Sequence, residues 1–173
     1  MTPTHPDPKA ETRTKENRRD WLMLTAFIVV TFGASFAATF SGSGNTEWYR
    51  SIAKPTWNPP SWIFGPVWTV LYFTIGIAGW LVWRKSGFRG ARWALAIFGV
   101  QLVINAAWSP VFFGLGRPDL AFILILVLIA AILATMVAFR KHDRRAAWML
   151  FPYLLWVSFA TVLNYAIMML NPR

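Results

Sequence analysis

Hydrophobic and polar positions along the chain are grouped in long blocks. Five runs of 20 residues or more contain no Asp, Glu, Lys or Arg, and mostly short polar or basic segments separate them. The runs are Trp21–Phe40, Ile63–Trp83, Trp93–Phe113, Leu120–Phe139 and Ala146–Leu170. A helix of about 20 residues, rising 1.5 Å per residue, crosses the ~30 Å hydrocarbon core of a bilayer. The pattern therefore predicts five transmembrane helices.

The fold class expected from this pattern is an all-α membrane protein, a five-transmembrane-helix bundle. Strands of a membrane barrel would alternate over about ten residues, and these runs do not. A signal peptide has an apolar region of about 7–15 residues, which is shorter than the first run. Residues 1–20 are polar and charged and are expected to form a disordered tail, whereas residues 21–173 form the transmembrane domain.

The charge distribution changes how the composition is interpreted. The chain has 17 Lys and Arg against 7 Asp and Glu, a formal net charge of +10, and 11 Trp, which could suggest nucleic-acid binding. With five spans, however, 13 basic residues fall on the side of the N-terminal tail and 4 on the other. The positive-inside rule then places the N-terminus in the cytoplasm and the C-terminus outside, if the protein lies in a bacterial inner membrane. Most aromatic residues lie within spans, so no nucleic-acid partner is expected.

The connection from Ser41 to Trp62 is the longest in the chain and is rich in Trp, Tyr, Pro and basic residues. Amphipathic rings of this kind favour the membrane interface, so the segment could be an interfacial anchor. Prolines also fix the backbone, and long ordered loops often have a function. The second interpretation is therefore a lid over the mouth of the bundle.

Polar residues within the spans are few and occur at helical spacing. Asn105 and Trp108 share a face of the third predicted helix with Gln101, and Trp156, Ala160 and Asn164 share a face of the fifth. An amide in hydrocarbon needs a partner helix or a cavity, so both interhelical hydrogen bonding and ligand binding are open. Together with Trp68 and Tyr72 of the second helix, these faces predict an aromatic pocket for a small molecule.

Several kinds of chemistry are missing from the spans. The chain has no Cys, and its two His residues, His5 and His142, lie outside the predicted helices. The sequence therefore predicts no metal site, no intrinsic cofactor and no His- or Cys-based catalysis in the bundle. The acidic residues beyond the tail lie near helix ends, which argues against an ion-coupled transporter.

Five motifs in order make the sequence resemble the TspO/MBR family, that is, the translocator proteins or tryptophan-rich sensory proteins. The resemblance covers about residues 20 to 170. The motifs are Trp48-Tyr49, Lys54-Pro55-x-Trp57-Asn58-Pro59-Pro60-x-Trp62, Gly65-Pro66-Val67-Trp68-Thr69-x-Leu71-Tyr72, Trp108-Ser109-Pro110-x-Phe112-Phe113-Gly114, and Pro152-Tyr153-Leu154-x-Trp156 through Leu163-Asn164-Tyr165.

The resemblance implies a homodimeric membrane protein that binds porphyrin or haem, and also sterols and benzodiazepine-type ligands, in a pocket closed by the first loop. It implies that Trp68 and Trp156 contact porphyrin and take part in any light-dependent breakdown of it. The sterol pattern near the C-terminus departs from the family, since seven residues separate Tyr165 from Arg173. The resemblance also assigns pocket positions to Ala38, Trp57, Asn105, Trp108, Leu120 and Ala160.

Three functions follow as hypotheses. The first is a tetrapyrrole-binding sensor, transporter or stress regulator, with a porphyrin such as protoporphyrin IX stacked on Trp68 and Trp156. Its propionates would meet Arg50 or Lys54, and Asn105 or Asn164 would supply a hydrogen bond. The second is a light-dependent porphyrin-degrading enzyme, which would rely on the photochemistry of its ligand. The third is a non-catalytic assembly or signalling partner.

Overall fold

The computed structural model describes the backbone of residues 8–42 and 46–172 and the side chains of residues 15–34, 36 and 47–172. Within these ranges the chain is helical and contains no strand. The helices are α1 (Pro8–Gly42), α2 (Thr46–Ser51), α3 (Ser61–Gly90), α4 (Arg92–Ser109), the π-helix η2 (Pro110–Gly114), α5 (Pro118–Arg140), α6 (Arg144–Met149) and α7 (Phe151–Leu170).

Four helical stretches in the described part are long and apolar enough to cross a membrane. They are Ser61–Gly90, Arg92–Gly114, Pro118–Arg140 and Arg144–Leu170. Each contains one of the five predicted runs, so these four predictions are confirmed as long apolar helices. The last stretch is interrupted at Leu150, between α6 and α7, where Pro152 cannot donate a backbone hydrogen bond.

Helix α1 contains the first predicted run and begins well before it. Disorder is expected from the sequence for residues 1–20, and the chain is helical from Pro8 onward, while residues 1–7 lie outside the described part. The polar segment is rich in Arg, Lys and Glu, which favour helix. Its end is also held by the bundle, because Arg84 Nε lies 3.1 Å from Asp20 Oδ2 and Trp80 Nε1 donates to the Asp20 carbonyl.

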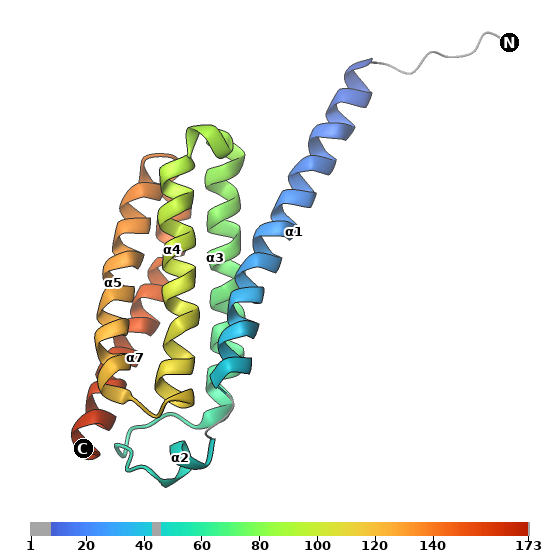
Figure 1. The fold of residues 1–173 in the computed structure, drawn as a ribbon. Coiled ribbons are helices and arrows are strands. Elements are labelled where there is room, and N and C mark those ends of the chain that lie inside the picture. Colours follow the sequence, from blue (N-terminus) through green and yellow to red (C-terminus); the bar gives the residue numbers. More distant parts are fainter. Residues whose placement is uncertain (1–7, 43–45, 173) are drawn as a thin grey trace, which may run out of the picture.

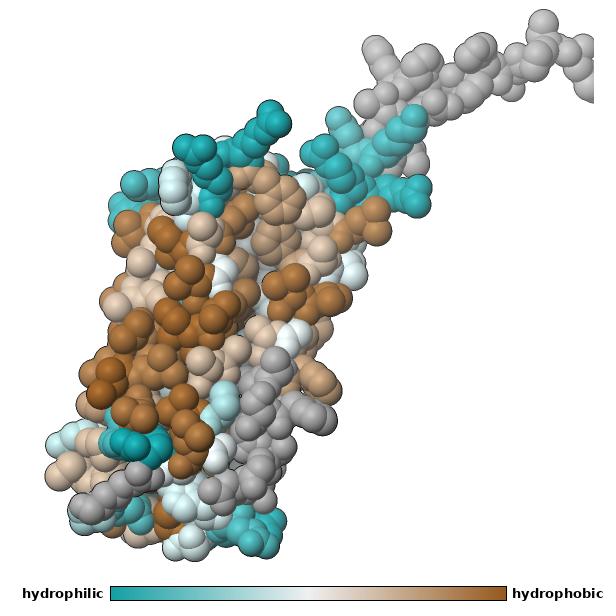
Figure 2. Space-filling model, viewed as in Figure 1, coloured by the Kyte–Doolittle hydropathy of each residue, from teal (hydrophilic) through white to brown (hydrophobic). Residues whose placement is uncertain are grey.

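The helices pack side by side along the long axis of the molecule (Figure 1). Helix α1 packs against α3 and α4, α4 packs against α5, and α5 packs against α7. The N-terminal part of α1 projects away from the other helices, and α2 lies beneath the opposite end of the bundle (Figure 1). The space-filling view shows an apolar belt between two ends that carry hydrophilic residues (Figure 2), as expected for a protein surrounded by lipid.

Two glycines of α3 set the distance between α3 and α1. A Cβ atom at Gly76 would lie 3.1 Å from the Cα of Ile28, and one at Gly79 would lie 2.9 Å from the Phe27 ring. The Thr31 hydroxyl of α1 donates to the Tyr72 carbonyl across the same contact. By contrast, a Cβ at Gly33 of α1 would meet nothing within 4 Å. The close approach therefore depends on small residues of α3, and not on the glycine of α1.

Candidate ligand-binding site

A buried hydrogen-bonded network joins α3, α4 and α7. The Tyr72 hydroxyl donates to Asn105 Oδ1 at 2.7 Å, and Asn105 Nδ2 donates to the Tyr153 hydroxyl at 2.8 Å. Gln101 Nε2 donates to the same hydroxyl at 2.8 Å. Gln101 and Tyr153 are both fully buried. Asn105 thus bridges two helices with both polar atoms of its amide.

The side-chain amide of Gln101 has fewer of its polar atoms hydrogen-bonded than that of Asn105. Its Oε1 is buried and has no hydrogen-bond partner among the described residues. A buried polar atom of this kind costs free energy, and most such atoms in folded proteins are paired. The network therefore contains one acceptor that contributes nothing to holding the helices together.

Two aromatic pairs connect α3 to α7 beside this network. The rings of Phe64 and Trp156 lie 5.8 Å apart, and those of Trp68 and Tyr153 lie 6.2 Å apart, both in edge-to-face geometry. On each helix the two aromatic residues lie about one turn apart, so the two pairs lie one after the other along the helix axes. The backbones of α3 and α7 approach each other at fewer positions than those of α4 and α5. Large rings therefore lie between α3 and α7, with Trp68 and Trp156 on adjacent levels.

The segment between α2 and α3 reaches this aromatic group at one end. The ring of Trp57 lies 6.1 Å from that of Phe159, which in turn contacts Trp156 at 5.5 Å. The side chain of Asn171, just after α7, accepts a hydrogen bond from the Ala53 N–H and donates one to the Ala53 carbonyl, each at 2.9 Å. Trp57 is half exposed, so it lies at the outer edge of this aromatic group.

Helix α2 covers a second aromatic cluster, which is built around η2. The Trp48 ring lies 5.8 Å from Phe112, and Phe112 stacks on Trp108 at 4.9 Å. Gly116 has a positive φ of 59°, and a Cβ there would lie 3.2 Å from the Trp48 ring. Glycine is thus required both by the backbone conformation and by the close approach of Trp48.

Asn164 belongs to this second cluster. Its Oδ1 accepts a hydrogen bond from Trp108 Nε1 at 3.3 Å, and its Nδ2 donates to the Pro118 carbonyl at 2.8 Å. Both polar atoms of the amide are therefore engaged between helices, as they are in Asn105. The two residues therefore form the interhelical hydrogen bonds that were one of the two interpretations of their spacing.

The basic residues of the loop have different environments. Lys54 Nζ donates to the Ile52 carbonyl at 3.0 Å and lies 4.7 Å from the centre of the Tyr49 ring. Burial raises the pKa of Tyr49, although its hydrogen bond to Asn58 acts in the opposite direction. Tyr49 therefore stays neutral at physiological pH. Arg50 is exposed, so of the two cations it is the one on the surface of the loop.

The remaining predicted site residues are spread over the bundle. Ala160 is half-buried against the main core, and Leu120 is exposed in the first turn of α5. The side chain of Ala38 lies outside the described residues. The structure thus brings Trp57, Trp68 and Trp156 into one aromatic group, places Trp108 and Asn164 in another, and links Asn105 to the first through Tyr153.

Three residues that connect the site were not singled out as site residues from the sequence. Phe64 and Phe159 contact Trp156, and Tyr153 contacts Trp68 and accepts both amide hydrogen bonds. A signal was present, since Phe64 lies four residues before Trp68, and Tyr153 lies three before Trp156. These spacings place each pair on one helix face.

Most of the chain is similar to one family of known proteins. Residues 24–170 match the TspO/MBR family. A tryptophan-rich protein TspO of Archaeoglobus fulgidus is 40% identical over 151 residues, which cover 87% of this chain and 97% of the relative. A tryptophan-rich sensory protein of Cereibacter sphaeroides is 39% identical over 152 residues, covering 88% and 93%. The translocator protein of Homo sapiens is 35% identical over 150 residues, covering 85% and 89%.

Proposed function

The chain belongs to the TspO/MBR family of membrane proteins, and on this premise we propose that it binds a tetrapyrrole, such as protoporphyrin IX or haem, between α3 and α7. The observation that carries the proposal is the pair of aromatic levels, Phe64 with Trp156 and Trp68 with Tyr153. A tetrapyrrole is a flat apolar ring system with acidic substituents. A binding site for it requires aromatic faces on which the ring can stack and a cation near the membrane surface that pairs with its acidic groups.

The ring geometry leaves some faces for stacking. Tyr72 stacks on Trp68 at 5.2 Å and covers one face of its indole. In an edge-to-face pair at least one ring has both faces free of its partner, so a flat ligand can pack against the faces that these contacts leave. Arg50 is an exposed cation on α2 at the same end of the molecule, and it can meet a propionate without giving up a hydrogen bond of the loop. Lys54 would have to leave the Ile52 carbonyl to do the same.

The proposal includes a fifth membrane span. Helix α1 carries the uncharged run Trp21–Phe40 and packs along α3, one of the four long apolar helices. Five spans place the basic tail and the connections before α4 and α6 on one side of the membrane. The ion pairs between Arg84 and Asp20 and between Lys85 and Asp143 join these segments at one end of the bundle. The positive-inside rule makes that end cytoplasmic.

Binding can be measured by titrating the purified protein in detergent with protoporphyrin IX. We expect saturable quenching of Trp fluorescence and a shift of the porphyrin absorbance band. Trp68→Phe and Trp156→Phe each keep a ring but remove the larger indole face, so each should weaken binding by about threefold to tenfold, in line with ~1 kcal/mol for an aromatic pair.

The matched control is Trp93→Phe. Trp93 is exposed near the start of α4 and makes no ring contact with the two aromatic groups described above. Its replacement should leave the absorbance titration unchanged. Equal affinities in all four proteins would contradict the proposal. Loss of binding only in the double variant Arg50→Gln, Lys54→Gln would place the ligand at the loop surface instead.

A further inference from the structure

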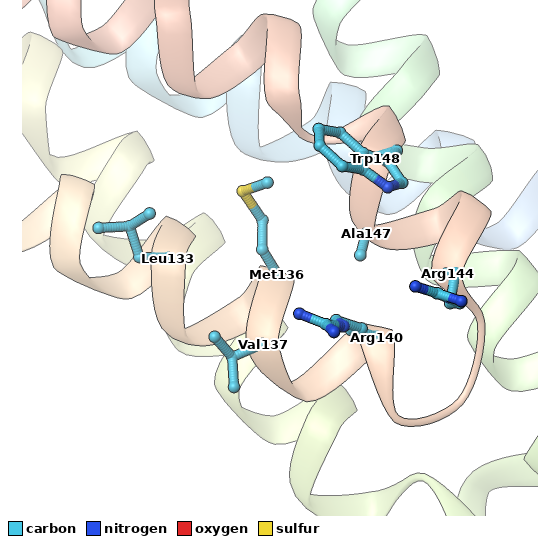
Figure 3. A pocket seen from close by; sticks show the side chains of 7 residues that line it. All are labelled: Leu133, Met136, Val137, Arg140, Arg144, Ala147 and Trp148. Carbon is cyan, nitrogen blue, oxygen red and sulfur yellow. The ribbon is translucent and has the colours of Figure 1, made fainter.

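A cavity of about 410 Å³ lies between α5 and α6, at the basic end of the molecule and away from the aromatic site. Residues of α5 form one wall, and residues of α6 form the other (Figure 3). The Met136 side chain extends from α5 toward the indole of Trp148 on α6 (Figure 3). Ala147 is buried behind them, and its small side chain leaves the space between the two helices open.

The cavity is apolar except for two arginines. Arg140 ends α5 and Arg144 begins α6, and both line the cavity. Both are exposed, and neither forms an ion pair or a hydrogen bond through its guanidinium with a described residue. The carboxylate of the same connection, Asp143, accepts from the Arg145 and Ala146 N–H groups and pairs with Lys85. Two cations therefore share one opening without a counter-ion from the described chain.

The position of the cavity along the bundle indicates which kind of anion could pair with these two arginines. Val137 and Trp148 are 63% and 68% exposed on the apolar belt, where acyl chains surround the protein. Trp side chains favour the boundary between acyl chains and headgroups. An inorganic anion could pair with the arginines but would leave the apolar walls unfilled. A molecule with both an anionic head and an acyl chain matches both parts of the cavity.

We propose that this cavity binds an anionic phospholipid. The phosphate pairs with Arg140 and Arg144, and one acyl chain lies between Met136 and Trp148 over Ala147. The site is separate from the aromatic group between α3 and α7, so the proposal does not depend on tetrapyrrole binding. It differs from a general attraction of basic loops to anionic membranes, because it requires a defined cavity and two particular residues.

The test is native mass spectrometry of the full chain in detergent, with dioleoyl phosphatidylglycerol as the anionic probe and dioleoyl phosphatidylcholine as the zwitterionic one. We expect one phosphatidylglycerol to remain bound at low micromolar lipid, with much weaker binding of phosphatidylcholine. Replacing both arginines, Arg140→Gln with Arg144→Gln, should weaken phosphatidylglycerol binding about thirtyfold, given the usual contribution of two basic residues near anionic lipid.

Further variants distinguish binding in the cavity from a general effect of the basic residues in this connection. Lys141 and Arg145 lie in the same connection and carry the same charges but do not line the cavity. Lys141→Gln with Arg145→Gln should therefore change binding less than threefold. Ala147→Leu keeps every charge and fills the cavity, so it should abolish the bound lipid. The thermal unfolding of each variant in detergent shows whether it is folded.

The proposal is overturned if the two charge pairs weaken binding equally, or if folded Ala147→Leu still retains the lipid. It is also overturned if inorganic phosphate at millimolar concentration displaces phosphatidylglycerol fully, since the acyl chain would then contribute nothing. Equal retention of phosphatidylcholine would show that the cavity does not select an anion, which contradicts the role of the arginines.

Discussion

Two amides on one face of α4 differ in how well their polar atoms are paired. Both atoms of the Asn105 amide are hydrogen-bonded between helices, whereas Gln101 keeps Oε1 without a described partner. They are nearly equally buried, at 6% and 0% exposed. Their spacing in the sequence predicted a shared face but not this difference, which depends on where the Tyr72 and Tyr153 hydroxyls lie.

The difference leads to a prediction about stability. Asn105→Leu removes two buried hydrogen bonds between helices, those to Tyr72 and Tyr153, and it should reduce the free energy of unfolding by about 1–3 kcal/mol. Gln101→Leu removes an unpaired acceptor together with one hydrogen bond, so its effect should be smaller than about 1 kcal/mol. Denaturation of both variants in detergent measures the two values. A larger loss for Gln101→Leu would contradict the assigned network.

Asp143 caps α6, and its charge makes a pH-dependent contribution. Burial by itself raises the pKa of Asp143, but hydrogen bonds from the Arg145 and Ala146 N–H groups, together with Lys85, outweigh it and lower the pKa below the ordinary value. A carboxylate with a lowered pKa stabilises the fold above its unfolded-state pKa near 4, and the contribution disappears as the pH falls through the folded-state value.

Asp143→Ala should therefore cost about 1 kcal/mol at pH 7 and much less at the acidic end of the folded range. Asp143→Asn retains a capping oxygen but not the charge, so it should be less destabilised at pH 7 and lose the pH dependence of this group. Melting temperatures of the three proteins between pH 3 and 7 provide the measurement. Parallel curves for all three would show that Asp143 is not linked to folding.

At the scale of elements, the contact between α1 and α3 depends on the size of the α3 side chains. Gly76 and Gly79 allow the backbone and rings of α1 to approach, and the Thr31 hydroxyl joins the two helices. The sequence contains small residues on both helices. Which set lies in the contact depends on the rotation of each helix about its axis, and a 20-residue apolar run without a polar face does not fix that rotation.

Gly76→Val should displace α1, because its Cβ would lie 3.0 Å from Thr31 Oγ1 and 3.1 Å from Ile28 Cα, and the Ile28 backbone cannot move aside as the end of a flexible side chain could. Overpacking of this kind costs about 1–3 kcal/mol. Gly33→Val places the same side chain where nothing lies within 4 Å of the Cβ, so it controls for the volume added and should be tolerated. Thermal unfolding in detergent measures both, and equal melting temperatures would contradict this helix contact.

At the scale of the whole molecule, the charge pattern and the four long apolar helices were predictable from the sequence, because about 20 uncharged residues have few alternatives to a membrane helix. The start of α1 at Pro8 was not, because the polar segment has no apolar face and Arg84 and Trp80 hold its end from a distant part of the chain. The aromatic levels between α3 and α7 were predicted only in part. The motifs marked Trp68 and Trp156, but Phe64 and Tyr153 acquire their role from the pairing of the two helices.

Orientation in the membrane can be tested directly, because the chain contains no cysteine. Thr56→Cys places a single thiol in the segment before α3, and Lys141→Cys places one between α5 and α6. Both positions are exposed. In intact cells an impermeant maleimide should label Thr56→Cys and not Lys141→Cys, and both should react after lysis. The reverse pattern would contradict a cytoplasmic N-terminus.

The Asn171 contact with Ala53 also has a consequence for the order of assembly. The two residues are 118 positions apart, so the loop is synthesised long before the side chain that pairs with its backbone. During synthesis the segment before α3 therefore cannot form its hydrogen bonds with Asn171 until α7 has been inserted. Closing this end of the bundle is therefore a late step in biogenesis, and an unfinished chain leaves the Trp57 side of the aromatic group uncovered.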